Sequence, residues 1–510
     1  MSSDPALQPI TSRHVAKGLG TTLLARTGAV VEIVAQPLYV VMFGLTGFGF
    51  YAVLWAAINI LQNIFDMGMT NALQRTVPQS ASRIEAVAAL RTAILCGVTP
   101  CLMASVAIYI YADQLAHIFN VAAEHQSILV PSIRIFVWAL PLWAFIEIMT
   151  AAMRAQMVFG AEIRLRIIWE QILRLVFAAI LYAAGYGLTG LLYAHLLSLS
   201  VTALLSIRLT ARYYDLADIF RAPWGSDISR NSVQAGLSVL PTNIISRIFT
   251  DAPMLILNFA LPGASGAMAA GLFTISRKLS SVVQLVRTAF SYVMAPLASS
   301  AEKRDRAQVT EIYAYATRFI VAVALPLSLV LAAGSGPLLS LFGPDAQMAK
   351  AALIILLMAR AIEAMMGISS PVLQVIAAYR HQLTASIIGI LSAIGAGFLA
   401  TPYMPPLTAV TLAMAVGLII SAAIPMIQLA WIERLHPFDH RFPSVLWRTL
   451  GLSAICCGAA TLFSQLPDFL SIPLIVISAV ASIWASLRFA LPIEDRASLG
   501  KLGRTLRLIP

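Results

Sequence analysis

Long apolar segments, repeated along almost the whole chain, constrain the fold more than any other feature of the sequence. A transmembrane helix needs about 20 predominantly apolar residues, and the 510 residues contain fourteen segments of that kind. Charged residues make up only 11% of the chain, against 59% hydrophobic residues, whereas soluble proteins carry about 25% charged residues. The sequence therefore predicts an all-α integral membrane protein with about fourteen transmembrane helices, and it excludes a sizeable soluble domain.

The charges of the connecting segments predict how the chain is oriented. The predicted spans lie near 18–43, 50–69, 86–111, 128–153, 163–185, 189–209, 232–259, 266–296, 313–342, 348–378, 382–401, 406–432, 445–466 and 470–490. Odd-numbered connections are uncharged or acidic, whereas even-numbered connections carry arginines. Because cytoplasmic loops collect Lys and Arg, both termini are predicted to be cytoplasmic. The net charge of +11 then reflects these loops, and no nucleic-acid partner is expected.

An internal duplication predicts two repeats of six spans each. The segment QPLYVVMFGLTGFG (36–49) aligns with APMLILNFALPGAS (252–265), and AAMRAQ (151–156) aligns with AAYRHQ (377–382). An even number of spans per repeat makes the two repeats parallel, with a substrate path between them. The predicted organisation is a cytoplasmic N-terminus (1–17), an N-lobe with spans 1–6 (18–209), an interfacial linker (210–231), a C-lobe with spans 7–12 (232–434), spans 13 and 14 (445–490) and a cytoplasmic basic tail (491–510).

The linker and the tail leave two interpretations open. Both mix aromatic or apolar residues with charges, which is typical of a short amphipathic helix lying in the membrane interface. A plain solvated segment fits the two stretches equally well.

Charged residues at membrane depth are costly and therefore need a partner, water or a function. Helical spacing predicts three ion pairs within single helices: Glu170–Arg174, Arg247–Asp251 and Arg360–Glu363. The charged residues without such a partner are Arg26, Glu32, Arg134, Glu147, Arg277, Lys278, Arg287 and Arg318. For Arg287 and Arg318, snorkelling to the cytoplasmic interface is the favoured interpretation.

Basic residues outnumber acidic ones inside the predicted spans, which favours an anionic substrate. Arginine suits phosphate in particular, because its planar fork binds two oxygens at once. The candidate substrate-binding residues are Arg26, Arg247, Arg277, Lys278 and Arg287. Glu32 and Asp251, the acids of the two helices that lead the repeats, are candidates for coupling transport to an ion.

Patterns of soluble-enzyme chemistry are missing from the sequence. It has no phosphate-binding Gly-x-x-x-x-Gly-Lys-Ser/Thr loop. The four cysteines lie in apolar segments, and His117 and His125 have no further ligands near them. We therefore expect no catalytic residue, no metal and no cofactor, and we expect the protein not to be an enzyme.

Two motifs resemble the polysaccharide transport branch of the multidrug/oligosaccharidyl-lipid/polysaccharide (MOP) exporter superfamily. Span 2 opens on a Gly-x-Tyr pattern at Gly49 and Tyr51 and ends on an Asp-x-Gly pattern, Asp66 and Gly68, near Arg75. The segment PLLSLFGPDAQMAKAALIILL (337–357) is similar to the family's connection between spans 9 and 10. Asp66, Gly68 and Arg75 are interpreted as structural residues at the end of span 2.

The resemblance implies a flippase for undecaprenyl-diphosphate-linked oligosaccharides of O-antigen or exopolysaccharide. Such a protein lies in the bacterial inner membrane and works by alternating access, with a central cavity lined mainly by spans 1, 2, 7 and 8. A polysaccharide polymerase and a chain-length regulator are possible partners under this reading. Two alternatives of the same superfamily stay open: a lipid II flippase, and a cation-coupled multidrug exporter, which would call for a more acidic cavity. A membrane-bound glycan polymerase or ligase is disfavoured, because the longest predicted periplasmic loop has only about sixteen residues.

Overall fold

The computed structural model describes residues 27–156, 158, 163–223, 225–301, 306–376 and 380–509. These residues are almost entirely helical, and no strand occurs among them. They form two compact units, here called the N-terminal unit (Ala25–Ile275) and the C-terminal unit (Ser276–Pro510). Helix α12 (Ala264–Ala301) passes from one unit into the other.

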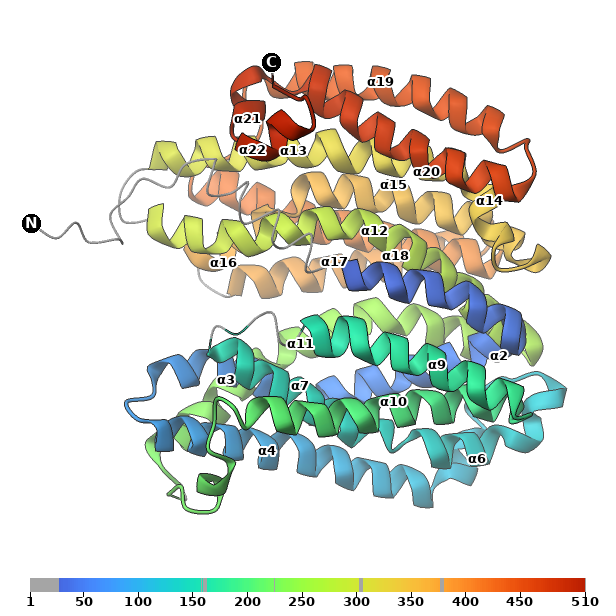
Figure 1. Cartoon of the computed structure of the whole chain (residues 1–510), viewed down its shortest axis with the longest axis vertical. Coiled ribbons are helices and arrows are strands. Elements are labelled where there is room, and N and C mark those ends of the chain that lie inside the picture. The colour runs from blue at the N-terminus through green and yellow to red at the C-terminus, as the bar shows by residue number, and fades with distance from the viewer. Residues whose placement is uncertain are drawn as a thin grey trace, which may run out of the picture. The chain divides into compact units, whose positions relative to one another are not determined.

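The N-terminal unit is a bundle of long helices (Figure 1). Its main helices are α2 (Thr27–Phe65), α3 (Met69–Thr76), α4 (Arg83–Ile110), α6 (Gln126–Phe136), α7 (Ala139–Ala155), α9 (Glu170–Ala183), α10 (Gly187–Thr210) and α11 (Asp227–Ala260). Helix α4 packs on α7, α10 packs on α7 and α9, and α11 packs on α2, α3 and α4. In this structure α11 thus belongs to the same unit as the first six predicted spans. The lobe boundaries at 18–209 and 232–434 stay a prediction.

The C-terminal unit is organised around α13 (Arg306–Ala333), which packs on α15, α19 and α20. Figure 1 shows these four helices side by side. The other elements are α14 (Ser335–Ser340), α15 (Lys350–Met366), α16 (Ser369–Ile376), α17 (Arg380–Ala400), α18 (Pro406–Ile432), α19 (Phe442–Phe463), α20 (Asp468–Ala485), α21 (Ile493–Ala497) and α22 (Gly500–Thr505). Helices α17 and α18 form a further closely packed pair.

Nine segments of the described chain are long and apolar enough to cross a membrane. The first, Val34–Phe65, covers two predicted spans, so these segments account for ten of the fourteen. The other four predicted spans correspond to α11, α12, the α15–α16 pair, and α9 with the π-helical turn before it, η4 (Ile163–Trp169). The all-helical membrane fold is therefore confirmed, and a count of fourteen spans is compatible with it.

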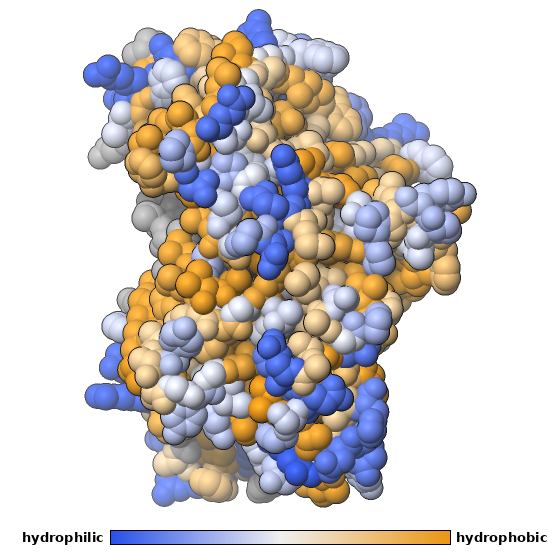
Figure 2. All heavy atoms as spheres, turned by 90° about the vertical axis from the view of Figure 1, so that its right-hand side faces the viewer, coloured by the Kyte–Doolittle hydropathy of each residue, from blue (hydrophilic) through white to orange (hydrophobic). Residues whose placement is uncertain are grey.

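Large apolar side chains cover much of the outside of the molecule. Phe398, Trp431 and Ile455 are 78%, 84% and 73% exposed. Figure 2, which faces the helix ends on the right of Figure 1, shows hydrophobic residues mixed with hydrophilic ones even there. Exposed apolar surface of this extent is suited to contact with lipid.

Glycines set the geometry at the end of the first predicted span. Gly44 has φ 72° and ψ 161° and divides α2 into two helical parts. The break thus lies in the connection expected between the first two predicted spans, 18–43 and 50–69, although residues 45–49 are themselves helical. A Cβ on Gly49 would lie 1.8 Å from the carbonyl oxygen of Ala267, so α2 and α12 are in backbone contact there.

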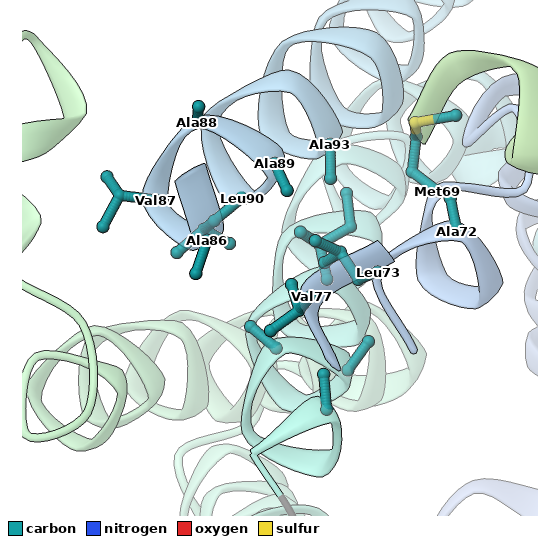
Figure 3. Close-up of a cluster of buried hydrophobic side chains, with 14 of the residues drawn as sticks. Met69, Ala72, Leu73, Val77, Ala86, Val87, Ala88, Ala89, Leu90 and Ala93 are labelled. Atoms are coloured by element: carbon teal, nitrogen blue, oxygen red, sulfur yellow. The ribbon is translucent and has the colours of Figure 1, made fainter. Parts of the chain in front are cut away.

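Part of the predicted linker (210–231) packs against the core of the N-terminal unit. Its helical parts in the described residues are the last residue of α10, the 3₁₀ turn η5 (Leu216–Ile219) and the first turn of α11. Tyr214 and Ala222 are buried in a cluster with α3 and α4, part of which is shown in Figure 3. Tyr214 donates a hydrogen bond to the carbonyl of Ala152 at 2.9 Å, and burial raises its pKa to about 12. The linker is thus anchored at Tyr214 and Ala222, while Phe220 stays exposed. Whether it lies in the membrane interface or in solvent stays a prediction.

Candidate functional site

Helix α11 is buried at its two ends but not in its middle. Its buried residues fall into two groups, Ile228, Ser229, Ser232, Ala235 and Gly236 at one end, and Asp251, Pro253, Met254, Leu257 and Asn258 at the other. The stretch 237–250 between them contains no buried residue, and at about 1.5 Å per residue it is about 21 Å long. Gly236, Asn243, Arg247 and Met254 lie on one helix face. The face that packs at both ends therefore carries polar residues in its open middle.

One end of α11 is fixed by close backbone contact and buried hydroxyl groups. Gly68 has φ 71°, and a Cβ on it would lie 2.4 Å from the carbonyl oxygen of Gly236. The Ser232 hydroxyl donates to the Thr76 hydroxyl at 3.0 Å. These contacts join α11 tightly to α3.

The other end of α11 is held by a pair of asparagines. The Asn120 backbone N–H donates to Asn258 Oδ1 at 3.1 Å, and Asn120 Nδ2 donates to the Asn258 carbonyl at 2.9 Å. In return, Asn258 Nδ2 donates to the Asn120 carbonyl at 2.6 Å. Phe119 and Phe259 meet edge to face beside them. This set of contacts, here called the asparagine clasp, joins α11 to the connection between α4 and α6.

The predicted pair Arg247–Asp251 is confirmed in the open part of α11. Arg247 Nη1 lies 3.5 Å from Asp251 Oδ2, where the side chains are 34% and 2% exposed. The buried carboxylate thus orients a guanidinium whose outer side stays accessible. Such an arginine can bind an anion while its own charge is partly balanced.

The other candidate basic residues lie on the part of α12 that belongs to the C-terminal unit. Arg277 and Lys278 are half-buried, and both take part in polar or electrostatic contacts. Arg287 Nη2 lies 3.3 Å from Glu363 Oε1, and Glu363 also binds Arg360, at 2.6 Å. Arg287 therefore bridges α12 and α15, which corrects the snorkelling interpretation. The pair Arg360–Glu363 is confirmed.

The side chains of two candidate residues, Arg26 for substrate binding and Glu32 for ion coupling, lie outside the described part of the structure. Arg26 lies outside the described residues. Glu32 belongs to the first part of α2, but its side chain is likewise outside the described part. A common cavity of Arg26, Arg247, Arg277 and Lys278 stays a prediction.

Asp66 shapes the turn between α2 and α3. Its carboxylate accepts hydrogen bonds from the Gly68 backbone N–H at 2.8 Å, from Gln62 Nε2 at 3.2 Å and from the Thr70 hydroxyl at 3.3 Å. Arg75 is exposed in the last turn of α3, where a positive charge stabilises the helix dipole. This geometry supports the structural interpretation of Asp66 and Gly68.

Several charged residues find partners that helical spacing does not predict. Arg166 binds both carboxylate oxygens of Glu147, at 2.7 and 3.1 Å, and Arg134 binds Asp113 at 2.7 Å. The predicted pair Glu170–Arg174 is confirmed, and Arg174 also donates to the Tyr51 hydroxyl at 3.3 Å. These charges have structural partners inside the N-terminal unit, so they are weaker candidates for a substrate site.

Arg318 differs most from its predicted environment. It is 4% exposed and binds Asp495 through Nε at 2.7 Å and Nη2 at 2.8 Å, and its Nη1 binds Asp439. The snorkelling interpretation is therefore wrong for this residue. Its partners lie more than one hundred residues away, so no local pattern could reveal them.

Two further sets of residues were missed by sequence reasoning. Arg91 of α4 donates to the carbonyls of Ile219, Ala222 and Pro223 and so fastens the linker. The asparagine clasp is the second set. Backbone carbonyls and single amides leave no recognisable spacing in a sequence.

Comparisons with known proteins agree with this architecture. The solved structure "Lipid II flippase MurJ, inward closed conformation" matches 91% of this chain and 97% of its own, with a TM-score of 0.69 and 13% identity. "Inward-facing conformation of a multidrug resistance MATE family transporter of the MOP superfamily" matches 84% of this chain and 97% of its own, with a TM-score of 0.64 and 15% identity. At such identities the likeness shows the fold. No curated protein sequence matches the chain.

A family comparison identifies the chain more directly. Residues 44–344, more than half of the chain, match the family described as "Polysaccharide biosynthesis protein". The match extends from the Gly44 break through α11 and α12 to the Gly343 turn before α15. The chain therefore belongs to this family of polysaccharide biosynthesis proteins, and its fold is similar to those of the solved MurJ and MATE-family transporters.

Proposed function

We propose that this protein is a flippase that moves undecaprenyl-diphosphate-linked oligosaccharide across the bacterial inner membrane by alternating access. The substrate is the repeat unit of O-antigen or exopolysaccharide. Both termini are cytoplasmic in this proposal, and a polymerase and a chain-length regulator act on the product. Membership in a polysaccharide biosynthesis family and the MurJ-like fold support a lipid-linked glycan as cargo.

The observation that carries the proposal is the accessible guanidinium of Arg247 in the open middle of α11. Its partner Asp251 is buried, whereas the arginine side chain stays 34% exposed and is accessible to an anion. A diphosphate loses hydration when it enters the membrane, and charge-assisted hydrogen bonds of about 1.5–3 kcal/mol each offset that loss. Arg26, Arg277 and Lys278 add positive charge in the proposed cavity, and Arg287, paired with Glu363, positions α12 against α15.

A buried counter-charge also prevents excessively tight binding. If Arg247 faced the diphosphate alone, release on the far side would be slow. Asp251 competes for the same guanidinium and lowers the affinity in both orientations. Glu32 and Asp251 remain the proposed residues for ion coupling.

The test uses purified protein in vesicles that contain a fluorescent undecaprenyl-diphosphate-linked oligosaccharide. The measurement is the rate at which lipid from the inner leaflet becomes accessible to an external reagent. We expect Arg26→Ala, Arg247→Ala and Arg277→Ala each to lower this rate by roughly tenfold or more, since each removes one charge-assisted contact. Arg247→Lys keeps the charge but loses the fork, so it should restore only part of the rate.

Arg221→Ala is the matched control, because this linker arginine is 81% exposed and only loosely paired with Asp218. Normal rates in all three alanine variants would refute the proposed site. Faster movement of lipid II than of the oligosaccharide lipid would favour the lipid II flippase. Export of an organic cation that depends on Glu32 or Asp251 would favour the multidrug exporter.

A further inference from the structure

The C-terminal tail is a folded part of the C-terminal unit. The last candidate membrane span, Asp468–Ala490, ends in the π-helical turn η7 (Ser486–Ala490), and α21 and α22 follow at once. Leu499 and Leu508 are buried in one cluster with Ala322 of α13 and Val445 of α19. The tail is thus fixed where a transmembrane segment ends, which is the depth of lipid head groups.

The acidic residues of the tail are paired with arginines outside it. Asp495 binds Arg318 of α13, and Glu494 binds Arg441 at 2.8 Å. In contrast, no carboxylate pairs with Arg488, Arg496, Arg504 or Arg507 in the part of the chain that the structure describes. The surface of the tail therefore carries an uncompensated positive charge.

Two of these arginines converge on a single backbone oxygen. Arg488 Nη1 donates to the Leu508 carbonyl at 2.8 Å, and Arg496 Nη1 donates to the same carbonyl at 3.1 Å and to the Arg488 carbonyl at 2.7 Å. Partial burial and the neighbouring Arg488 charge lower the pKa of Arg496. Its Nε is buried without a hydrogen-bond partner among the described residues. Two guanidiniums held side by side by neutral carbonyls form a site for an anion.

Next to this pair of arginines, the backbone of a third arginine, Arg507, adopts the left-handed conformation. Arg507 has φ 53° at the end of α22, where the Leu508 N–H closes back on the Gly503 carbonyl at 2.8 Å. Helix ends of this kind usually carry glycine, because other side chains are strained in the left-handed region. The Arg507 side chain is exposed at this position, next to the Leu508 carbonyl that accepts from Arg488 and Arg496.

Aromatic residues place the arginines at the membrane surface. Trp484 and Phe489 flank Arg488 and are 40% and 56% exposed, and Trp484 Nε1 donates to the Leu506 carbonyl at 2.9 Å. Tryptophans at the end of an apolar span are typical of the membrane interface. The ligand that lies at this depth is the phosphate of a phospholipid.

We propose that Arg488, Arg496, Arg504 and Arg507 form a binding site for the phosphate group of an anionic phospholipid. The site is separate from the proposed transport path and does not depend on the identity of the transported lipid. Arg488 and Arg496 hold the phosphate, while the exposed Arg504 and Arg507 add electrostatic attraction. Bound lipid then fixes the tail, and through Asp495 and Arg318 it also stabilises α13.

The test compares the full-length protein in nanodiscs of phosphatidylcholine with and without phosphatidylglycerol. Native mass spectrometry measures the phosphatidylglycerol that stays bound, and thermal unfolding measures its stabilising effect. We expect retention to fall by roughly fivefold for each arginine removed in Arg488→Gln, Arg496→Gln and the double variant. Arg230→Gln, which removes an exposed arginine of the N-terminal unit, should retain the lipid as wild type does.

Arg507→Gly separates loss of the site from loss of the fold. Glycine relieves the backbone strain, so this variant should be at least as stable as wild type in neutral nanodiscs yet retain less phosphatidylglycerol. Equal retention by wild type and the double variant would overturn the proposal. If inorganic phosphate in neutral nanodiscs stabilises the protein as much as phosphatidylglycerol does, the site takes a soluble anion and the lipid assignment is wrong.

Discussion

Asn120 and Asn258 hold each other through three hydrogen bonds although 138 residues separate them in the chain. Each uses its side-chain amide to bind the backbone of the other, so neither can be replaced by a merely polar residue. Hydrogen bonds of this kind contribute about 0.5–1.5 kcal/mol each. The clasp is thus strong enough to close one end of α11 and weak enough to open during a transport cycle.

The first prediction is that locking the clasp stops transport. In a variant without the four native cysteines, Asn120→Cys with Asn258→Cys is treated with a short, reducible thiol cross-linker. We expect transport to be lost on cross-linking and regained on reduction, because alternating access requires this contact to open. The matched control is Ser105→Cys with Val137→Cys, where Ser105 of α4 donates a hydrogen bond to the carbonyl of Val137, the residue that follows α6. Undiminished transport by the cross-linked clasp would show that this end of α11 stays closed throughout.

The second prediction concerns the buried ion pair of the tail. Asp495→Asn leaves Arg318 with Asp439 as its only remaining carboxylate, and loss of a buried partner costs about 3–5 kcal/mol. We expect a lower free energy of unfolding, measured by thermal or chemical denaturation in detergent. Glu494→Gln, one residue away, removes an exposed pair and should change stability by less than about 1 kcal/mol. Similar effects of both substitutions would argue against a structural role for the buried pair.

The third prediction tests the contact between α2 and α12. Gly49→Ala places a Cβ where the Ala267 carbonyl oxygen lies, so the two helices must separate. We expect a strong loss of folded protein, measured as the monodisperse fraction in size-exclusion chromatography. Gly451→Ala in α19 is the control, since a Cβ there meets no atom within 4 Å. Replacement of a helical glycine by alanine at such an open site should be neutral or stabilising.

The fourth prediction separates structure from transport at Asp66. Asp66→Ala removes the acceptor of three hydrogen bonds in the turn before α3. We expect lower protein abundance in the membrane but near-normal transport per molecule, while Asp66→Asn should recover part of the abundance. Normal abundance without transport would instead make Asp66 a direct participant in substrate movement.

The features that a sequence can predict here are those contained in one helix. The pairs Glu170–Arg174 and Arg360–Glu363 follow from helical spacing, because a single helix fixes the distance between the partners. The apolar spans follow from hydropathy for the same local reason. Arg318 was misjudged because its partners Asp439 and Asp495 reach it only through the packing of α13 against the folded tail.

Distant contacts also limit what the sequence can predict about the helix break in α2 and about the candidate site. Helix α2 divides at Gly44, inside the connection expected between spans 1 and 2, but the remaining residues of that connection are helical. The ion pair of Arg247 with Asp251 was predictable, because the two residues lie one helical turn apart. The docking of α11 at Gly236 and Asn258 was not, because it depends on backbone contacts with distant segments.

A helix held at both ends and open between them behaves mechanically like a beam on two supports. Its deflection under load is greatest near the middle of the open stretch 237–250, about one turn from Arg247. Pro241 lies inside that stretch and Pro253 just beyond it, and each lacks the backbone N–H that would stiffen the preceding turn. A small rotation at either support is therefore converted into a larger sideways movement of the guanidinium, so the arginine can follow a moving charge even before the asparagine clasp opens.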